Sequence, residues 1–216
     1  MALRRIGLLG GTFDPIHVGH LALARAACTA LRLDEMRLLP TGRSWQKAGA
    51  GATNDQRLAM ARLAIAEAPG WSVDDREMRR SGATYTVDTL RELRAQPSPD
   101  SALVLVLGSD QLHNLATWHC YQNLLSYAHI AATQRGLQRL ADFPPEVEAL
   151  LLEHGRDALP DDQAAGTVVF FRMPPVPVSA TALRTAFARG ERPVELLPPP
   201  VLDYIERHHL YRTRAT

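Results

Sequence analysis

An unbroken run of apolar residues, Ala102–Leu107, is the sequence feature that most constrains the fold. Gly108 ends the run, so its length is that of a strand and not of an ordinary helix. A strand without alternating polar residues is buried on both faces, as are the central strands of parallel sheets that helices cover. The run therefore predicts a buried central strand of an α/β sheet.

Strands and helices are predicted to alternate along the rest of the chain. The other predicted strands are Ile6–Leu9, Met36–Leu39, Trp71–Val73, Ala128–Thr133 and Thr167–Phe171. The predicted helices cover residues 18–33, 55–68, 84–95, 144–153, 180–189 and roughly 199–208, with helical turns at 110–126. This alternation predicts a doubly wound, Rossmann-like parallel sheet with helices on both faces and a small C-terminal helical part.

The charge balance argues against a protein that coats nucleic acid. Lysine and arginine number 24 and aspartate and glutamate 23, which gives a formal net charge of +1. No apolar run is long enough for a transmembrane helix, and the N-terminus lacks a signal-peptide pattern. The 2 cysteines, Cys28 and Cys120, form no CxxC pattern. We therefore expect a cytoplasmic protein that binds neither membrane nor nucleic acid.

The segment Gly10–His20 joins the first predicted strand to the first predicted helix, where doubly wound sheets bind ligands. Gly10 and Gly11 allow a ligand to approach the backbone, and the helix start offers free N–H groups to phosphate. His17 and His20 share one face of the first helical turn, so they can donate hydrogen bonds to phosphate oxygens and supply positive charge. The segment matches neither the dinucleotide fingerprint G-x-G-x-x-G nor a P-loop.

A second segment, Val178–Arg184, opens a helix near the other end of the chain. Ser179 is suited to cap this helix. Ser179, Thr181 and the free N–H groups can hold a triphosphate, and Arg184 adds positive charge one turn along. Taken alone, the segment is better explained as an ordinary capped helix with an exposed arginine.

Together the two segments resemble the HxGH nucleotidyltransferase superfamily. Gly10–His20, which reads GGTFDPIHVGH, is similar to the nicotinate mononucleotide branch, and Val178–Arg184 resembles the motif ISSTxxR. Ala180 replaces the second serine and removes one hydroxyl contact to ATP. The resemblance implies a single nucleotidyltransferase domain, residues 1–216, which joins the adenylyl group of ATP to nicotinate mononucleotide and releases pyrophosphate in NAD biosynthesis.

The resemblance continues through the middle of the chain, at Gly82–Leu90 and Leu107–Asp110 and around Trp118. Trp118 offers a flat face for a pyridine ring, although a core tryptophan is the alternative explanation. Asp110 follows the buried strand and can accept hydrogen bonds from ribose hydroxyls. The resemblance implies that backbone N–H groups at Thr86 and His119 receive the nicotinate carboxylate.

The resemblance implies a complete set of site residues. The expected catalytic residues are His17, His20 and Arg184. The expected ATP contacts are Gly10, Gly11, Thr12, Phe13, His20, Gly108, Asp110, Arg135, Ser179, Thr181 and Arg184. The expected mononucleotide contacts are Thr12, His17, Lys47, Thr86, Asp110, Trp118 and His119. Whether Lys47 or Arg43 contacts phosphate stays open, and Arg57 is left out of the predicted site.

The expected reaction is a direct attack of the mononucleotide phosphate on the α-phosphorus of ATP, helped by positioning and charge neutralisation. Mg²⁺ is expected to be bound mainly through the ATP phosphates, with no dedicated protein metal site. Two alternatives stay open: a pantetheine phosphate adenylyltransferase, and a nucleotide-binding regulatory module without activity. The sequence gives neither the oligomeric state nor the degree of preference for the nicotinate substrate.

Overall fold

The computed structural model describes residues 2–42, 51–96, 101–134 and 142–212. Within these ranges the strands form a 6-stranded sheet with the order β3-β2-β1-β4-β5-β6. The strands are β1 (Arg4–Gly11), β2 (Glu35–Pro40), β3 (Trp71–Val73), β4 (Ser101–Leu107), β5 (His129–Thr133) and β6 (Val168–Phe171). β4 pairs in parallel with β1 and with β5, and β5 pairs in parallel with β6. The predicted doubly wound α/β class is confirmed.

The predicted helices are also present. They are α1 (Val18–Leu31), α2 (Asn54–Ala64), α4 (Thr86–Arg94), α5 (Ser109–His113), α6 (Pro145–His154), α7 (Ala180–Ala188) and α8 (Pro199–Arg207), together with α3 (Arg76–Arg79). The helical turns predicted for 110–126 comprise α5 and two 3₁₀ helices, Leu115–Thr117 and Tyr121–Ser126. A further 3₁₀ helix covers Val194–Leu196.

Several helix ends differ from the prediction, and the C-terminal ends of α1 and α2 show why. α1 ends before Arg32, which has a left-handed backbone with φ of 52° and so cannot continue the helix. α2 ends at Ala64, not at the predicted residue 68, and the N–H of Ile65 bonds to the carbonyl of Arg62 in a tighter turn. The apolar pattern continued past both ends, which is why the sequence overestimated the helix lengths.

Contacts divide the chain into two compact units. Unit 1 comprises Met1–Gly10, Leu23–Arg37 and Tyr85–Pro174, and unit 2 comprises Gly11–Ala22, Leu38–Thr84 and Pro175–Thr216. The boundary crosses β1 at its last residues, so the two predicted phosphate-binding segments lie almost wholly in unit 2. The expectation of a single nucleotidyltransferase domain stays a prediction.

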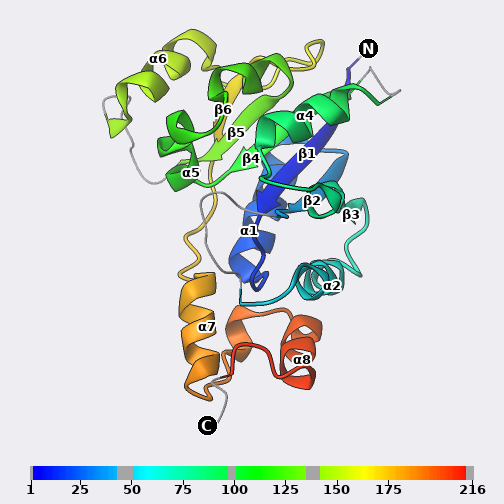
Figure 1. The fold of residues 1–216 in the computed structure, drawn as a ribbon. Coiled ribbons are helices and arrows are strands. Elements are labelled where there is room, and N and C mark those ends of the chain that lie inside the picture. Colours follow the sequence, from blue (N-terminus) through cyan, green and yellow to red (C-terminus); the bar gives the residue numbers. More distant parts are fainter. Residues whose placement is uncertain (1, 43–50, 97–100, 135–141, 213–216) are drawn as a thin grey trace. The chain divides into compact units, whose positions relative to one another are not determined.

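Unit 1 is built around β4, the strand that the apolar run predicted. Every residue of β4 is buried, as is every residue of β5. Figure 1 shows β4, β5 and β6 side by side, with α4, α5 and α6 around them. In a sheet with this strand order, the order reverses between β1 and β4, and the carboxyl ends of these strands flank the expected ligand crevice.

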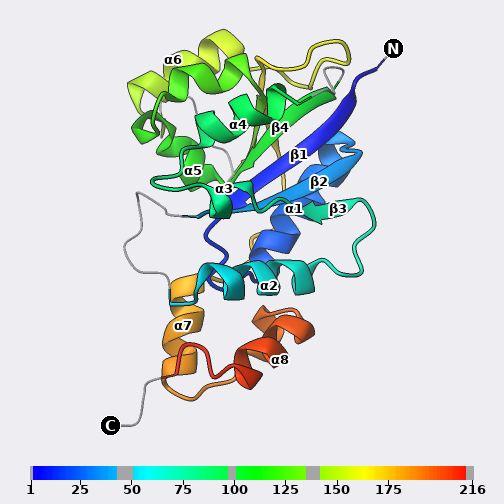
Figure 2. The ribbon, with the colours of Figure 1, turned by 45° about the vertical axis from the view of Figure 1, so that its right-hand side comes forward.

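Unit 2 contains the C-terminal helical part that the sequence predicted. α2 packs against α8, as Figure 2 shows, and the buried faces include Met60 from α2 and Val201 and Ile205 from α8. α8 begins after Pro198 with prolines in its first turn, where proline costs no hydrogen bond. Among the described helices of both units, none combines the length and apolar character that a bilayer span requires.

Candidate active site

The loop after β1 folds tightly around Phe13. Phe13 is buried and has a left-handed backbone with φ of 50°. A side chain at Gly11 would meet the Phe13 ring at 2.8 Å, so only glycine fits beside it. A side chain at Gly10 would meet no described atom within 4 Å. The backbone at Gly10 is therefore open to an approaching group, and its contact with ATP stays a prediction.

His17 and His20 lie together in this loop and the first turn of α1. Their rings stack with centroids 3.7 Å apart and an interplanar angle of 23°. The backbone N–H of His17 donates to Nδ1 of His20 at 3.2 Å, and the His20 ring also meets Phe13 edge-on. Because Nδ1 of His20 accepts this bond, the proton of the neutral imidazole lies on Nε2. His20 can therefore donate a hydrogen bond from Nε2.

His17 is buried, and this burial lowers its pKa from 6.5 to about 4, although a backbone hydrogen bond opposes the shift. The imidazole is thus neutral at neutral pH, so it offers a hydrogen bond and not the positive charge that the sequence led us to expect. Among the described residues, its Nδ1 is buried without a hydrogen-bond partner. Unsatisfied buried polar atoms are rare and often mark functional positions.

The start of α7 has the capping geometry that the sequence predicted. Ser179 is the N-cap, and its Oγ accepts a hydrogen bond from the N–H of Ala182 at 3.2 Å. Thr181 is exposed in the first turn, and its Oγ1 accepts from Nη2 of Arg184 at 3.4 Å. The positive end of the helix dipole and these exposed hydroxyls are suited to an anion.

The two motif segments meet within unit 2. Nη1 of Arg184 donates to the backbone carbonyl of Asp14 at 2.7 Å, across 170 positions of sequence. A side chain at Gly19 would meet Val178 at 2.8 Å and the His17 ring at 3.1 Å. Gly19 therefore permits the close approach of the second segment to the histidine loop. The structure thereby brings together the two segments that the sequence could only place at opposite ends of the chain.

Arg57 is a member of this cluster that the sequence left out. Its side chain is 1% exposed and donates to the carbonyls of Thr12 at 2.6 Å and Gly42 at 3.2 Å, and to Oδ1 of Asn54 at 2.6 Å. Burial lowers the pKa of the guanidinium, while the nearby Asp14 carboxylate raises it. Arg57 therefore holds the carbonyl of a predicted ligand-binding loop. Nothing in the helical spacing distinguishes such an arginine from a solvated one.

Asp110 and Gly108 follow β4 in unit 1, as predicted. Gly108 precedes α5, and its N–H donates to Oε1 of Gln111 at 2.9 Å. The Asp110 side chain is exposed in the first turn of α5, and the neighbouring Ser109 N–H donates to Oγ1 of Thr133 at 3.0 Å. Asp110 thus lies at the carboxyl end of the central strand, where ligands bind in this class of fold.

Trp118 and His119 lie beside the start of α4 in unit 1. α4 begins at Thr86, and the ring of Tyr85, directly before it, contacts the His119 ring with centroids 4.3 Å apart. Trp118 is half-buried and His119 is exposed. Trp118 is thus not fully buried, and its stacking role stays a prediction. The first N–H groups of a helix have no partner within it, so those at the start of α4 can face a carboxylate.

Three of the basic residues considered from the sequence, Arg43, Lys47 and Arg135, lie outside the described residues. Within the described ranges, no cluster of three or more histidine, cysteine, aspartate or glutamate side chains is arranged to hold a metal ion.

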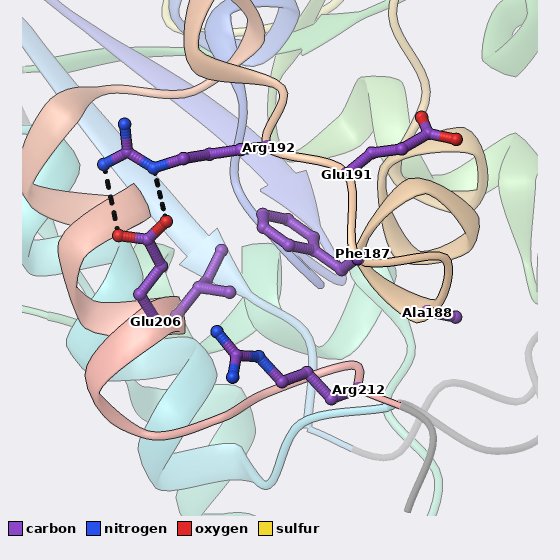
Figure 3. Close-up of a pocket in the computed structure, with 8 residues that line it drawn as sticks. Phe187, Ala188, Glu191, Arg192, Glu206 and Arg212 are labelled. Carbon is purple, nitrogen blue, oxygen red and sulfur yellow. Dashed lines mark hydrogen bonds and ion pairs between the residues drawn. The ribbon is translucent and has the colours of Figure 1, made fainter.

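Two cavities adjoin α7 in unit 2. One, of about 510 Å³, includes Ser179 and has a mostly apolar lining that includes Val178 and Leu183. The other, of about 490 Å³, is drawn in Figure 3 and is lined by Phe187, Ala188, Gly190, Glu191, Arg192, Ile205, Glu206 and Arg212. In the second cavity Arg192 is neutralised by Glu206 through two hydrogen bonds, and no predicted site residue lines it. Of these two cavities, the first is the one that a predicted site residue lines.

Comparison with known proteins gives consistent findings. The model of a family described as cytidylyltransferase-like matches residues 8–186. A protein of Herminiimonas arsenicoxydans named probable nicotinate-nucleotide adenylyltransferase is 42% identical over 216 residues, covering 97% of this chain and 98% of the relative. A protein of the same name from Aeromonas salmonicida (strain A449) is 46% identical over 210 residues, covering 96% and 97%.

A solved structure supports the fold independently. Plasmodium falciparum nicotinic acid mononucleotide adenylyltransferase complexed with NaAD superposes with a TM-score of 0.73, covering 96% of this chain and 97% of that one. The sequence identity is 17%, so this likeness concerns the fold alone.

Proposed function

Because the chain belongs to the nicotinate-nucleotide adenylyltransferases of the cytidylyltransferase-like family, we infer that it transfers the adenylyl group of ATP to nicotinate mononucleotide. The products are nicotinate adenine dinucleotide and pyrophosphate, and the reaction belongs to NAD biosynthesis. An oxygen of the mononucleotide phosphate bonds to the α-phosphorus of ATP, and the bond from that phosphorus to the bridging oxygen of the departing pyrophosphate breaks. The attacking phosphate is already ionised, so the reaction needs no strong base.

The meeting of the two motif segments is the observation that carries this assignment. Arg184 at the second segment is anchored to the carbonyl of Asp14 in the first at 2.7 Å, while its side chain stays 33% exposed. The N-terminus of α7 and His20, whose Nδ1 accepts from the His17 N–H, belong to the same unit. A triphosphate needs several donors aimed from different segments, and preorganised donors stabilise charge in a transition state.

We assign the triphosphate and the transferring phosphoryl group to unit 2. His20 donates from Nε2, Arg184 supplies positive charge, and Ser179, Thr181 and the free N–H groups of α7 hold the other phosphate oxygens. His17, neutral in its buried position, offers a hydrogen bond to the mononucleotide phosphate. Mg²⁺ bound to the triphosphate oxygens supplies further charge neutralisation, because this ion keeps most of its waters and favours phosphate ligands.

We assign the nicotinate ring and its carboxylate to unit 1. The nicotinate ring stacks on the half-buried Trp118, and N–H groups at Thr86 and His119 receive the carboxylate. Asp110 accepts hydrogen bonds from ribose hydroxyls. Gly10, Gly11, Thr12 and Phe13 form the turn that passes close to the nucleotides. With ATP and a pyridine mononucleotide as substrates, we expect the enzyme to act in the cytoplasm as a single domain.

The test is the release of pyrophosphate from Mg·ATP with nicotinate mononucleotide, nicotinamide mononucleotide and phosphopantetheine offered separately. We expect strong preference for the nicotinate substrate. Equal use of both pyridines would retain the reaction and contradict the carboxylate site. Activity with phosphopantetheine alone would overturn the substrate, and inactivity with all three would favour a regulatory nucleotide-binding protein.

A further inference from the structure

The carboxylate of Asp14 is enclosed by hydrogen-bond donors. The residue is 3% exposed. Oδ2 accepts from the N–H of Gly51 at 2.6 Å, and Oδ1 accepts from the N–H of Ala52 at 3.1 Å and from the hydroxyl of Tyr211 at 2.7 Å. A buried carboxylate requires such donors, because each missing one leaves charge uncompensated.

Tyr211 comes from the far end of the chain and is fixed by its surroundings. Its ring lies 6.0 Å from that of Phe187, and a side chain at Gly51 would meet the ring at 3.0 Å. Burial and the Asp14 carboxylate raise the pKa of the phenol, so the hydroxyl stays protonated and acts as a donor. Its backbone is left-handed with φ of 63°, a conformation that a non-glycine residue adopts only when its contacts support it.

Arg184 lies on the other side of the same carboxylate. Nη1 is 2.7 Å from the Asp14 carbonyl but 3.9 Å from carboxylate Oδ2, so the guanidinium is bonded to the backbone and not closely paired with the carboxylate. Two backbone N–H groups and the Tyr211 hydroxyl already satisfy that carboxylate. Without the hydroxyl, the carboxylate would attract Arg184 more strongly and draw its N–H groups away from a ligand.

We propose that Tyr211 is a positioning residue for ATP binding: its hydroxyl satisfies Asp14 and thereby keeps Arg184 directed at the triphosphate. The inference rests on the proposed function, because that function assigns Arg184 to phosphate. Tyr211 itself touches no substrate in this scheme. Tyr211 thus completes a site whose motifs begin at Gly10.

The test compares Tyr211→Phe, which removes only the hydroxyl, with Tyr204→Phe on α8, whose ring contacts His208. The dissociation constant of Mg·ATP is measured by isothermal titration calorimetry, whose stoichiometry reports the folded fraction. Losing a hydrogen bond to a charged group should raise this constant about tenfold in Tyr211→Phe. The Tyr204→Phe control should stay within about twofold of wild type.

A double-mutant cycle separates positioning from general damage. In an Arg184→Ala background, Tyr211→Phe should change the dissociation constant by less than about twofold, since no guanidinium remains to be misdirected. An equal loss in both backgrounds, no loss in either, or an Arg184→Ala variant that binds Mg·ATP like wild type would overturn the proposal. Failure of the proposed function would appear differently, as normal Mg·ATP binding without pyrophosphate release from nicotinate mononucleotide.

Discussion

The two groups of predicted site residues differ in how firmly the protein holds them. In unit 2 the phosphate segments rest on buried charged groups, with Asp14 3% and Arg57 1% exposed. In unit 1 Trp118 is half-buried, and Asp110 and His119 are exposed. A triphosphate benefits from donors fixed before it binds, whereas stacking needs an open ring face. Changes in unit 2 should therefore affect stability and chemistry, and changes at Trp118 should affect substrate affinity alone.

Arg57→Ala should give the largest effect, on stability. It removes the donor to Thr12, Gly42 and Asn54 and leaves Arg184 as the remaining nearby cation for the buried Asp14 carboxylate. Breaking a buried charged network typically costs about 3–5 kcal/mol. Urea unfolding followed by circular dichroism measures this loss.

Arg62→Ala is the matched control on the same helix. Arg62 pairs with Asp75 at 3.7 Å, and its side chain is 61% exposed, so its loss should cost about 0.5 kcal/mol or less. Similar losses for both variants would mean that the buried cluster does not stabilise unit 2 as the comparison requires.

His20→Ala should lower kcat by about 10²–10³-fold, as removal of a transition-state donor does. Two further variants test whether the loss of kcat comes from the missing hydrogen-bond donor at Nε2. His20→Asn retains an acceptor for the His17 N–H but loses the donor at Nε2. His20→Gln has a longer side chain, whose amide N–H can lie near the position that Nε2 occupies in wild type. Steady-state pyrophosphate release should rank the glutamine variant above the asparagine variant. A fully active alanine variant with native circular dichroism would contradict the catalytic role.

Sequence reasoning located the strands and both motif segments because their signals are local. Ala102–Leu107 could only be a buried strand, and β4 occupies Ser101–Leu107. α3 was missed because Arg76–Arg79 is one charged helical turn, too short for any apolar period. Local patterns predict whether a segment forms a helix or a strand, with errors of a few residues at its ends.

The supporting groups of the site could not be predicted in the same way. Tyr211 and Asp14 are 197 positions apart, and no spacing rule links a tyrosine near the end of a chain to a loop near its start. Arg57 occupies an ordinary helical position until the fold buries it. The charge expected of His17 was also wrong, because a single sequence contains no measure of desolvation.

Lowering the pH should reduce the free energy of unfolding, because the folded protein buries His17 as a neutral imidazole. Above about pH 6.5 the imidazole is neutral in both the folded and the unfolded chain, so stability is unaffected. As the pH falls from 6.5 to about 4, the unfolded chain binds a proton that the folded chain does not, and stability declines. The decline from this residue is at most about 3 kcal/mol. Urea unfolding of wild type and His17→Asn at several pH values measures it.

His129 in unit 1 is a second buried histidine, and its contribution to acid sensitivity can be compared with that of His17. Burial also lowers its pKa, but its ring nitrogens are near the Gln163 carbonyl at 2.9 Å and the Thr167 N–H at 3.2 Å. The His17→Asn variant should therefore keep a weaker acid sensitivity that His129 contributes. Wild-type and variant curves that run parallel from pH 7 to 4 would show that His17 is not desolvated in the folded protein.

Trp118→Ala should have the smallest effect of these variants. Unlike the changes in unit 2, it should weaken binding of the mononucleotide without lowering stability. Loss of a stacking face costs about 1–3 kcal/mol of binding, so KM for nicotinate mononucleotide should rise about 5–150-fold while KM for ATP and the unfolding midpoint barely change. Trp118→Phe keeps a ring and should recover part of the affinity. Trp71→Ala, on β3, should leave KM for the mononucleotide unchanged. If Trp118→Ala instead lowered the unfolding midpoint as much as Arg57→Ala, Trp118 would be a structural residue, and the contrast between a fixed phosphate site and an open ring site would be lost.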